Sequence, residues 1–237
     1  MYRPPHSPSA GFTLVEILLA VTIFAVVSSI LFGSYSKTLD NVEATDRSIH
    51  GYAQAKACLE RMTADLTSLA VTDKTTYKPP ETSRSDNDPW RFEGLERDGA
   101  ADMPRLKFSS RAHVDLAGDG REGVAEIVYS AEKDAGDRPG YVIRRRDTLM
   151  ADLFEDKDRP APILCDAVKS LRFLYYDADG NEADSWDSDS DGSGYATPRR
   201  VAIFLDIIGP GGPDGPPVHF ETQVELPVYR DKPEGVS

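Results

Sequence analysis

The sequence predicts an α+β fold in which one long N-terminal helix packs on a largely antiparallel β-sheet. Three observations lead to this fold class. The longest apolar run of the chain, GFTLVEILLAVTIFAVVSSILF, begins at Gly11, near the N-terminus. An apolar stripe with helical spacing follows around Leu59, and the rest of the chain alternates strand-like runs with short polar turns. One helix followed by many strands is the order typical of α+β domains.

The composition indicates one folded domain rather than several small ones. The chain has 237 residues, of which 40% are hydrophobic and 28% are charged, so it can form a sizeable core. Its formal net charge is -13, and this charge would repel nucleic acids and anionic lipid surfaces. We therefore expect no nucleic-acid partner, whereas an acidic surface is compatible with divalent cations.

The apolar run predicts a transmembrane helix. Between Phe12 and Phe32 the only ionisable residue is Glu16, and a helix needs about 20 apolar residues to cross a bilayer. A secretory signal peptide has a shorter apolar core with small residues after it, whereas here the small residues precede the run. The basic Arg3 precedes the run and several acids follow it, which favours an N-terminus in the cytoplasm and a folded body outside.

Glu16 raises the question of what a carboxylate does inside this run. A carboxylate within a bilayer is costly unless it is paired, and its own segment is expected to offer no partner. Cleavage between Gly11 and Phe12 would create a new α-amino group about one helical turn away, and the same group on a neighbouring helix would be able to pair with Glu16. Glu16 is therefore predicted to act in assembly.

These residues carry a resemblance. A short polar leader that ends in Gly11, then Phe12, then Glu16 within an apolar helix resembles the processing signal of type IV pilins and type II secretion pseudopilins. The resemblance implies a pilin-like fold, a single span in the bacterial inner membrane and a periplasmic body. It also implies that a prepilin peptidase cuts after Gly11 and methylates Phe12, and that Glu16 pairs with an amino terminus in the growing filament.

The helix is predicted to continue beyond the membrane, from about Phe12 to about Ala70, with a bend near Gly33 or Gly51. Its second half is amphipathic, with an apolar stripe formed by Leu59, Met62, Leu66 and Leu69. We expect this stripe to pack on the β-domain and, where it stays uncovered, to contact a partner helix. The predicted parts are a leader (1–11), a transmembrane half-helix (12–33), an amphipathic periplasmic half-helix (34–72) and a β-rich domain (73–237).

The C-terminal part is predicted to consist mostly of β-strands. Residues Tyr77–Pro104 show no periodicity and are predicted to form a surface loop, with one short strand at Trp90–Phe92. The segment Gly209–Pro217 is rich in proline and glycine, so it is predicted to be a flexible loop. Six longer strand-like runs are Arg105–Ser110, Val124–Tyr129, Tyr141–Arg146, Val168–Tyr176, Val201–Ile208 and His219–Tyr229.

Three sequence blocks resemble the J-type minor pseudopilins of type II secretion. They are LERMTADL, which begins at Leu59, LCDAVKSLRFLYYDADGNEADSW, which begins at Leu164, and PRRVAIFLDI, which begins at Pro198. The resemblance implies a structural subunit that joins I-type and K-type minor pseudopilins in the tip or initiation complex of the periplasmic pseudopilus, which drives protein export. Two alternatives are a minor pilin of a type IV or competence pilus and a pilin-tethered calcium-dependent adhesin.

An acidic loop has the spacing of a calcium-binding loop. Asp187, Asp189 and Asp191 form the pattern D-x-D-x-D-G, which lets a turning chain direct alternate carboxylates at a hard cation such as Ca2+. Asp184 is a further candidate ligand. An EF-hand would need glutamate where this chain has Pro198, so the loop is not an EF-hand. It is either a solvated acidic loop or a calcium site, and no other cofactor is expected.

The sequence shows no motif typical of an enzyme. The four histidines are scattered, and there is no His-Glu-x-x-His motif, no Gly-x-Ser-x-Gly elbow and no phosphate-binding loop. We therefore expect a structural protein without catalytic residues. The two cysteines, Cys58 and Cys165, are too few for a disulfide-rich scaffold. Buried thiols and a single bridge in an oxidising compartment are both compatible with the sequence.

Overall fold

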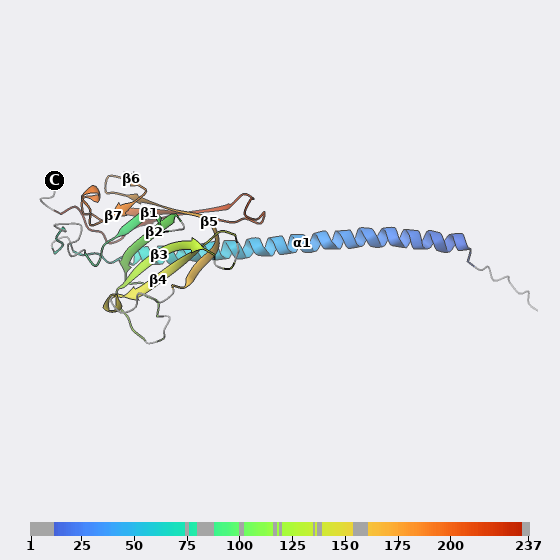
Figure 1. The fold of residues 1–237 in the computed structure, drawn as a ribbon, viewed down its shortest axis with the longest axis horizontal. Coiled ribbons are helices and arrows are strands. Elements are labelled where there is room, and N and C mark those ends of the chain that lie inside the picture. Colours follow the sequence, from blue (N-terminus) through green and yellow to red (C-terminus); the bar gives the residue numbers. More distant parts are fainter. Residues whose placement is uncertain are drawn as a thin grey trace, which may run out of the picture. The chain divides into compact units, whose positions relative to one another are not determined.

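The computed structural model describes residues 12–73, 76–79, 88–99, 102–115, 118, 120–134, 136, 139–153 and 161–233, without the side chains of residues 40, 41, 43–48 and 50. The chain divides into two compact units, Met1–Arg47 and Ser48–Ser237. Helix α1, Leu14–Thr67, begins in the first unit and ends in the second (Figure 1). It contains no proline, and it continues as one α-helix through both glycines at which a bend was predicted.

In the first unit, α1 is strongly apolar and exposes its side chains. The segment Leu14–Leu39 has a mean hydropathy of 2.6, and its most apolar stretch of 18 residues is 0% buried within the protein. By length and composition this segment is a candidate membrane span. An apolar surface of this extent is unfavourable in water and favourable in the hydrocarbon layer of a bilayer.

The second unit contains one nine-stranded antiparallel sheet (Figure 1). The strand order is β7-β1-β2-β3-β4-β5-β8-β9, and β6 pairs with β5, so most consecutive strands are neighbours. This confirms the predicted α+β class with a largely antiparallel sheet. The strands are β1 (Glu93–Asp98), β2 (Met103–Ser110), β3 (Ala125–Lys133), β4 (Tyr141–Leu149), β5 (Ile163–Tyr176), β6 (Glu182–Ala183), β7 (Trp186–Asp187), β8 (Arg200–Ile207) and β9 (Val218–Glu225).

The six predicted long strands are all present, although their ends differ from the prediction. β5 begins at Ile163 rather than Val168. The short strand predicted at Trp90–Phe92 is absent, and β1 begins instead at Glu93, within the segment predicted to be a surface loop. The prediction missed β6 and β7, because strands of two residues are too short to show alternation.

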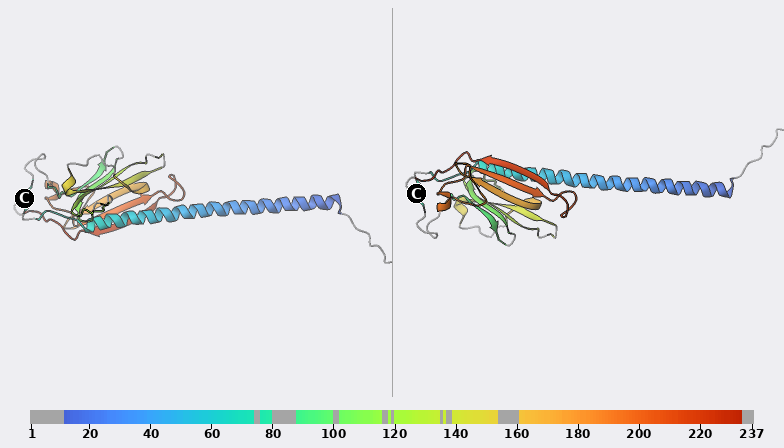
Figure 2. Two further views of the ribbon diagram at one scale, coloured as in Figure 1. Left: turned by 90° about the horizontal axis from the view of Figure 1, so that it is seen from below. Right: turned by 90° about the horizontal axis from the view of Figure 1, so that it is seen from above.

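The sheet curls, so that the C-terminal end of β5 lies near β1. The chain after β5 returns to the opposite edge of the sheet, where β7 pairs with β1. Phe92, just before β1, packs edge-on against Tyr175 of β5, with ring centroids 5.9 Å apart. Figure 2 shows the curled sheet from two opposite sides. The concave inner face of the sheet forms one wall of the hydrophobic core.

The last turns of α1 form the other wall of this core. The four residues of the apolar stripe are buried, with at most 9% of any of them exposed, and they belong to one hydrophobic cluster with residues of the sheet. This confirms that the stripe packs on the β-domain, whereas contact with a partner helix, expected only where the stripe is uncovered, stays a prediction. The residues concerned are Leu59, Met62, Leu66 and Leu69.

A disulfide bond joins α1 to the sheet. Cys58 of α1 and Cys165 of β5 are bonded, with their Cα atoms 6.0 Å apart and a sequence separation of 107. Both side chains are completely buried. Of the two possibilities compatible with the sequence, the structure shows the bridge, which requires an oxidising compartment to persist.

Replacing both cysteines by serine is expected to lower the free energy of unfolding by about 2–4 kcal/mol, because the bridge restricts the unfolded chain over a long loop. Urea denaturation can follow this through the fluorescence of the two tryptophans, Trp90 and Trp186, which both lie in the second unit. A reductant should weaken the natural protein by a similar amount and leave the double-serine variant unchanged. An unaltered transition of the natural protein in reductant would show that the bridge adds no stability.

Candidate functional site

The Glu16 side chain has a hydrogen-bond partner in its own segment, contrary to the prediction. The backbone N–H and the hydroxyl of Thr13 donate to Glu16 Oε2 at 2.9 and 3.0 Å. In return, the backbone N–H of Glu16 donates to Thr13 Oγ1 at 3.3 Å. Thr13 directly precedes Leu14, the first residue of α1. Thr13 and Glu16 thus form a capping box, in which each residue satisfies an N–H group of the other.

The capping box fixes the position of Glu16 without explaining its charge. A glutamine at the same position can complete such a box, so the cap needs an acceptor oxygen and not an anion. Phe12, the residue predicted to follow the cleavage site, is 86% exposed. Gly11 and the rest of the predicted leader lie outside the described residues.

The acidic loop around β7 binds partners within the same chain. Asp187 accepts two hydrogen bonds from the guanidinium of Arg91, each 2.7 Å long. Asp189 accepts one from the Tyr77 hydroxyl at 2.6 Å and one from the N–H of Asp88 at 2.9 Å. Burial, followed by the hydrogen bond to Asp189, raises the pKa of Tyr77 above its usual value, which extends the pH range over which this hydroxyl is a donor.

Arg230 supplies a second cation to this loop. Its guanidinium pairs with Asp88, lies 3.7 Å from Asp189 Oδ1 and stacks on the Tyr77 ring, 3.4 Å from the ring centroid. It also donates to the carbonyl of Ser188 at 2.7 Å. The side chain is 0% exposed. Sequence analysis missed Arg230, because nothing in the local pattern separates it from the other arginines.

Calcium binding by this loop stays a prediction. Asp184 and Asp191 are exposed, whereas the carboxylates of Asp187 and Asp189 already accept hydrogen bonds from protein donors. The described part of the chain holds no group of three or more His, Cys, Asp or Glu side chains placed to hold a metal ion. Titration calorimetry with calcium tests this site, and heat equal to that of dilution into buffer would reject it.

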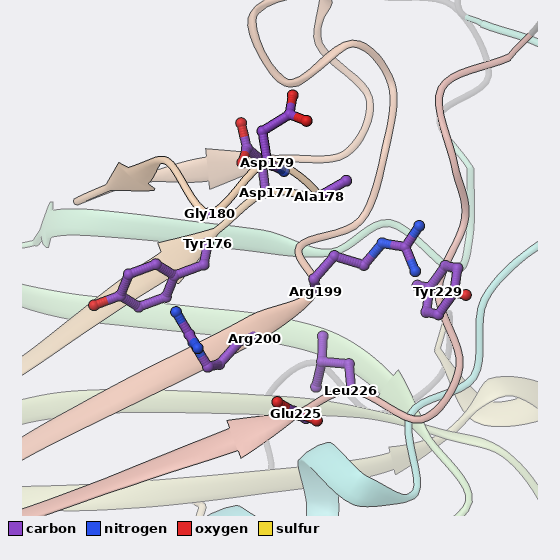
Figure 3. Close-up of a pocket in the computed structure, with 10 residues that line it drawn as sticks. All are labelled: Tyr176, Asp177, Ala178, Asp179, Gly180, Arg199, Arg200, Glu225, Leu226 and Tyr229. Carbon is purple, nitrogen blue, oxygen red and sulfur yellow. Dashed lines mark hydrogen bonds between the residues drawn. The ribbon is translucent and has the colours of Figure 1, made fainter.

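A cavity of about 580 Å³ lies beside the turn that follows β5 (Figure 3). Two arginines in it stack on tyrosines: Arg200 lies over Tyr176 at 4.2 Å from the ring centroid, and Arg199 lies over Tyr229 at 3.2 Å. The described lining residues include no serine, cysteine or histidine. They are Tyr176, Asp177, Ala178, Asp179, Gly180, Arg199, Arg200, Glu225, Leu226 and Tyr229.

One of the three carboxylates that line this cavity, that of Asp177, closes a tight turn. Asp177 accepts hydrogen bonds from the N–H groups of Asp179 and Asn181 and from the side-chain amide of Asn181, each 2.8 Å long. The amide of Asn181 makes the largest contribution to holding the pKa of Asp177 below its usual value. A carboxylate stabilised in its charged form is a weak base, so Asp177 is suited to holding the turn.

An apolar N-terminal helix with a capped glutamate in its first turn, followed by an antiparallel sheet, defines a pilin-like structural subunit with one candidate membrane span. A model of the prokaryotic N-terminal methylation motif matches residues 6–32. A model of type II secretion system protein J matches residues 33–212. The chain therefore belongs to the type II secretion system protein J family, and it is a minor pseudopilin.

A solved structure is also similar to this chain. It is a chain in the crystal structure of the GspK-GspI-GspJ complex from the enterotoxigenic Escherichia coli type 2 secretion system. The TM-score is 0.44 and the sequence identity is 17%, and the match covers 74% of this chain and 97% of that chain. No curated protein matches this chain in a sequence comparison. The family assignment rests on the protein J model, which favours type II secretion over the pilus and adhesin alternatives.

Proposed function

We propose that this minor pseudopilin joins I-type and K-type subunits in the tip or initiation complex of the periplasmic pseudopilus. The family match over residues 33–212 carries this proposal, because the J-type members that the sequence resembles have this role. The chain acts by assembly and not by catalysis.

The proposal includes a processing step and an orientation. The prepilin peptidase removes residues 1–11 and methylates Phe12, residues 12–33 anchor the chain in the inner membrane, and residues 34–72 and 73–237 lie in the periplasm. The N-terminus is cytoplasmic before assembly. The disulfide in the second unit supports a periplasmic location, because the cytoplasm keeps thiols reduced.

Complex formation tests the proposed function. The full-length protein is co-expressed with the I-type and K-type subunits of the same cell, extracted in detergent and analysed by size-exclusion chromatography with light scattering. A stable complex with one copy of each subunit is expected. If the protein elutes alone although both partners are folded, the proposed role is wrong.

Replacing Glu16 by glutamine is expected to reduce incorporation into the pseudopilus at least about tenfold, which corresponds to the loss of about 1.4 kcal/mol of binding free energy. Glutamine can complete the capping box with Thr13 but has no charge to pair with an amino terminus. Quantitative immunoblotting of isolated pseudopili measures the effect. Thr13→Val is the control, because it removes the capping hydroxyl and keeps the charge. Normal incorporation of the glutamine variant would show that Glu16 acts only as part of the helix cap and that its charge has no role in assembly.

A further inference from the structure

Strand β9 has a free edge. Among the described strands it pairs only with β8, at the end of the strand order. The N–H of Leu226 donates to the carbonyl of Arg199 at 2.9 Å, in the register of this pair. Because hydrogen-bonded residues alternate along an antiparallel ladder, the even-numbered residues of β9 bond to β8. The residues whose backbone N–H and C=O groups point to the free edge are His219, Glu221, Gln223 and Glu225.

An apolar groove of about 420 Å³ runs between β9 and α1, within the second unit. The ring of Tyr52 lies 5.3 Å from that of Phe220, and Tyr52 is 60% exposed although it is one of the large apolar residues of this unit. Figure 2 shows the red strand β9 beside the cyan end of α1. The residues that line the groove are Tyr52, Lys56, Leu59, Glu60, Thr63 and Ala64 of α1 and Phe220, Glu221 and Thr222 of β9.

The outer face of β9 carries two acidic residues. The side chains of the strand alternate between a buried or partly buried set and an exposed set, which consists of His219, Glu221, Gln223 and Glu225. Arg200 of β8 lies opposite Glu225, and Phe204 lies opposite Glu221. Acidic side chains placed opposite one another on paired strands are destabilising, which disfavours a second copy of β9 as the neighbour. Lysine or arginine opposite these glutamates would be stabilising.

We propose that the free edge of β9 and the adjacent groove bind one extended segment of a partner subunit, which adds to the sheet as a further strand. Its alternate side chains are apolar and fill the groove, and those between them include lysine or arginine opposite Glu221 and Glu225. Backbone hydrogen bonds provide affinity in this mode of recognition, and the groove provides specificity. The inference rests on the proposed function, in which this chain assembles with I-type and K-type subunits.

Amide hydrogen exchange of the full-length protein in detergent, alone and in complex with these subunits, tests the added strand directly. The amides of Glu221 and Gln223 are expected to exchange at least about tenfold more slowly in the complex. The amide of Thr222, which bonds to β8, is the internal reference and should change little. Unchanged exchange at Glu221 and Gln223 in a complex that forms would overturn the proposal.

A substitution at the edge provides the second test. Gln223→Pro removes an N–H group from the free edge without removing a bond to β8, and proline is tolerated on edge strands. It is expected to weaken partner binding at least about tenfold. Gln223→Ala, the matched control, removes the side chain, keeps the N–H and should bind like the natural protein.

The two tests separate this inference from the proposed function. If the natural protein and Gln223→Pro bind equally well, as they would if a helix occupied the groove, the added strand is wrong and the proposed function stands. If the natural protein binds neither subunit, the proposed function fails and the inference fails with it. If Gln223→Pro does not fold, the exchange experiment on the natural protein decides.

Discussion

Replacing Asp65 by asparagine is expected to lower the free energy of unfolding of the second unit by about 3–5 kcal/mol, which is the usual cost of removing one partner of a buried ion pair. The Asp65 carboxylate is completely buried and accepts hydrogen bonds from Arg145 Nε at 2.6 Å and Nη2 at 3.1 Å. It also accepts from the Tyr129 hydroxyl and from Arg61. Asparagine removes the anion and leaves these cations facing a neutral amide.

Arg145 cannot regain by hydration what it loses when the anion is removed. Its side chain is only 6% exposed, and it also pairs with the carboxylate of Asp147, at 2.7 Å. Burial, followed by the charge of Asp65, raises the pKa of Tyr129 well above its usual value, so Tyr129 stays a donor. In the variant, these donors are buried around a group that can accept fewer hydrogen bonds.

Urea denaturation followed by tryptophan fluorescence measures the loss. Glu60→Gln, on the same helix, is the matched control: it removes the same charge from a side chain that is 67% exposed, and it should change stability by no more than about 0.5 kcal/mol. If both variants unfold at the same urea concentration, the buried network around Asp65 contributes no stability.

Sequence patterns predicted the helix, the long strands and the buried stripe, but not this network. Hydrophobic periodicity places a polar residue such as Asp65 on the solvent face with Glu60 and Arg61, because it records only the type of residue. Asp65 is buried because Arg145, 80 residues away, is carried to it by β4. No local pattern contains that pairing.

The functional residues divide in the same way. The signature of the capping box is present in the sequence, as threonine followed by glutamate three residues later before an apolar run, but the prediction overlooked it and gave Glu16 no partner in its own segment. The acidic loop was also visible, but its partners were not. Arg91 and Arg230 lie outside the loop in sequence and reach it only in the folded chain. Two of the aspartates in this spacing thus lie beside guanidinium groups, and calcium binding by the loop stays a prediction.

Replacing Arg230 by methionine is expected to lower the free energy of unfolding by about 3–5 kcal/mol. Methionine keeps an apolar stem over the Tyr77 ring but removes the cation from Asp88 and Asp189, whose side chains are 4% and 2% exposed. Two acidic side chains then remain buried close together, linked by the hydrogen bond from the Asp88 N–H to Asp189. Urea denaturation measures the loss.

Arg199→Met is the control for this substitution. Arg199 also stacks on a tyrosine and pairs with an acid, Asp231, but its side chain is 30% exposed and that of Asp231 is 50% exposed. Exposed pairs contribute about 0–1 kcal/mol, so this variant should remain close to the natural protein. Equal losses in the two arginine variants would show that the burial of Arg230 has no energetic consequence.

A second substitution identifies the cause of the loss. If unpaired acids destabilise Arg230→Met, adding Asp88→Asn removes one of them. The loss in free energy of unfolding of the double variant should then be smaller than the sum of the two single losses by about 1–3 kcal/mol. Additive losses would mean instead that Arg230 stabilises the loop through its hydrogen bonds to backbone carbonyls, such as that of Ser188. The cycle therefore separates charge neutralisation from backbone bonding at the same side chain.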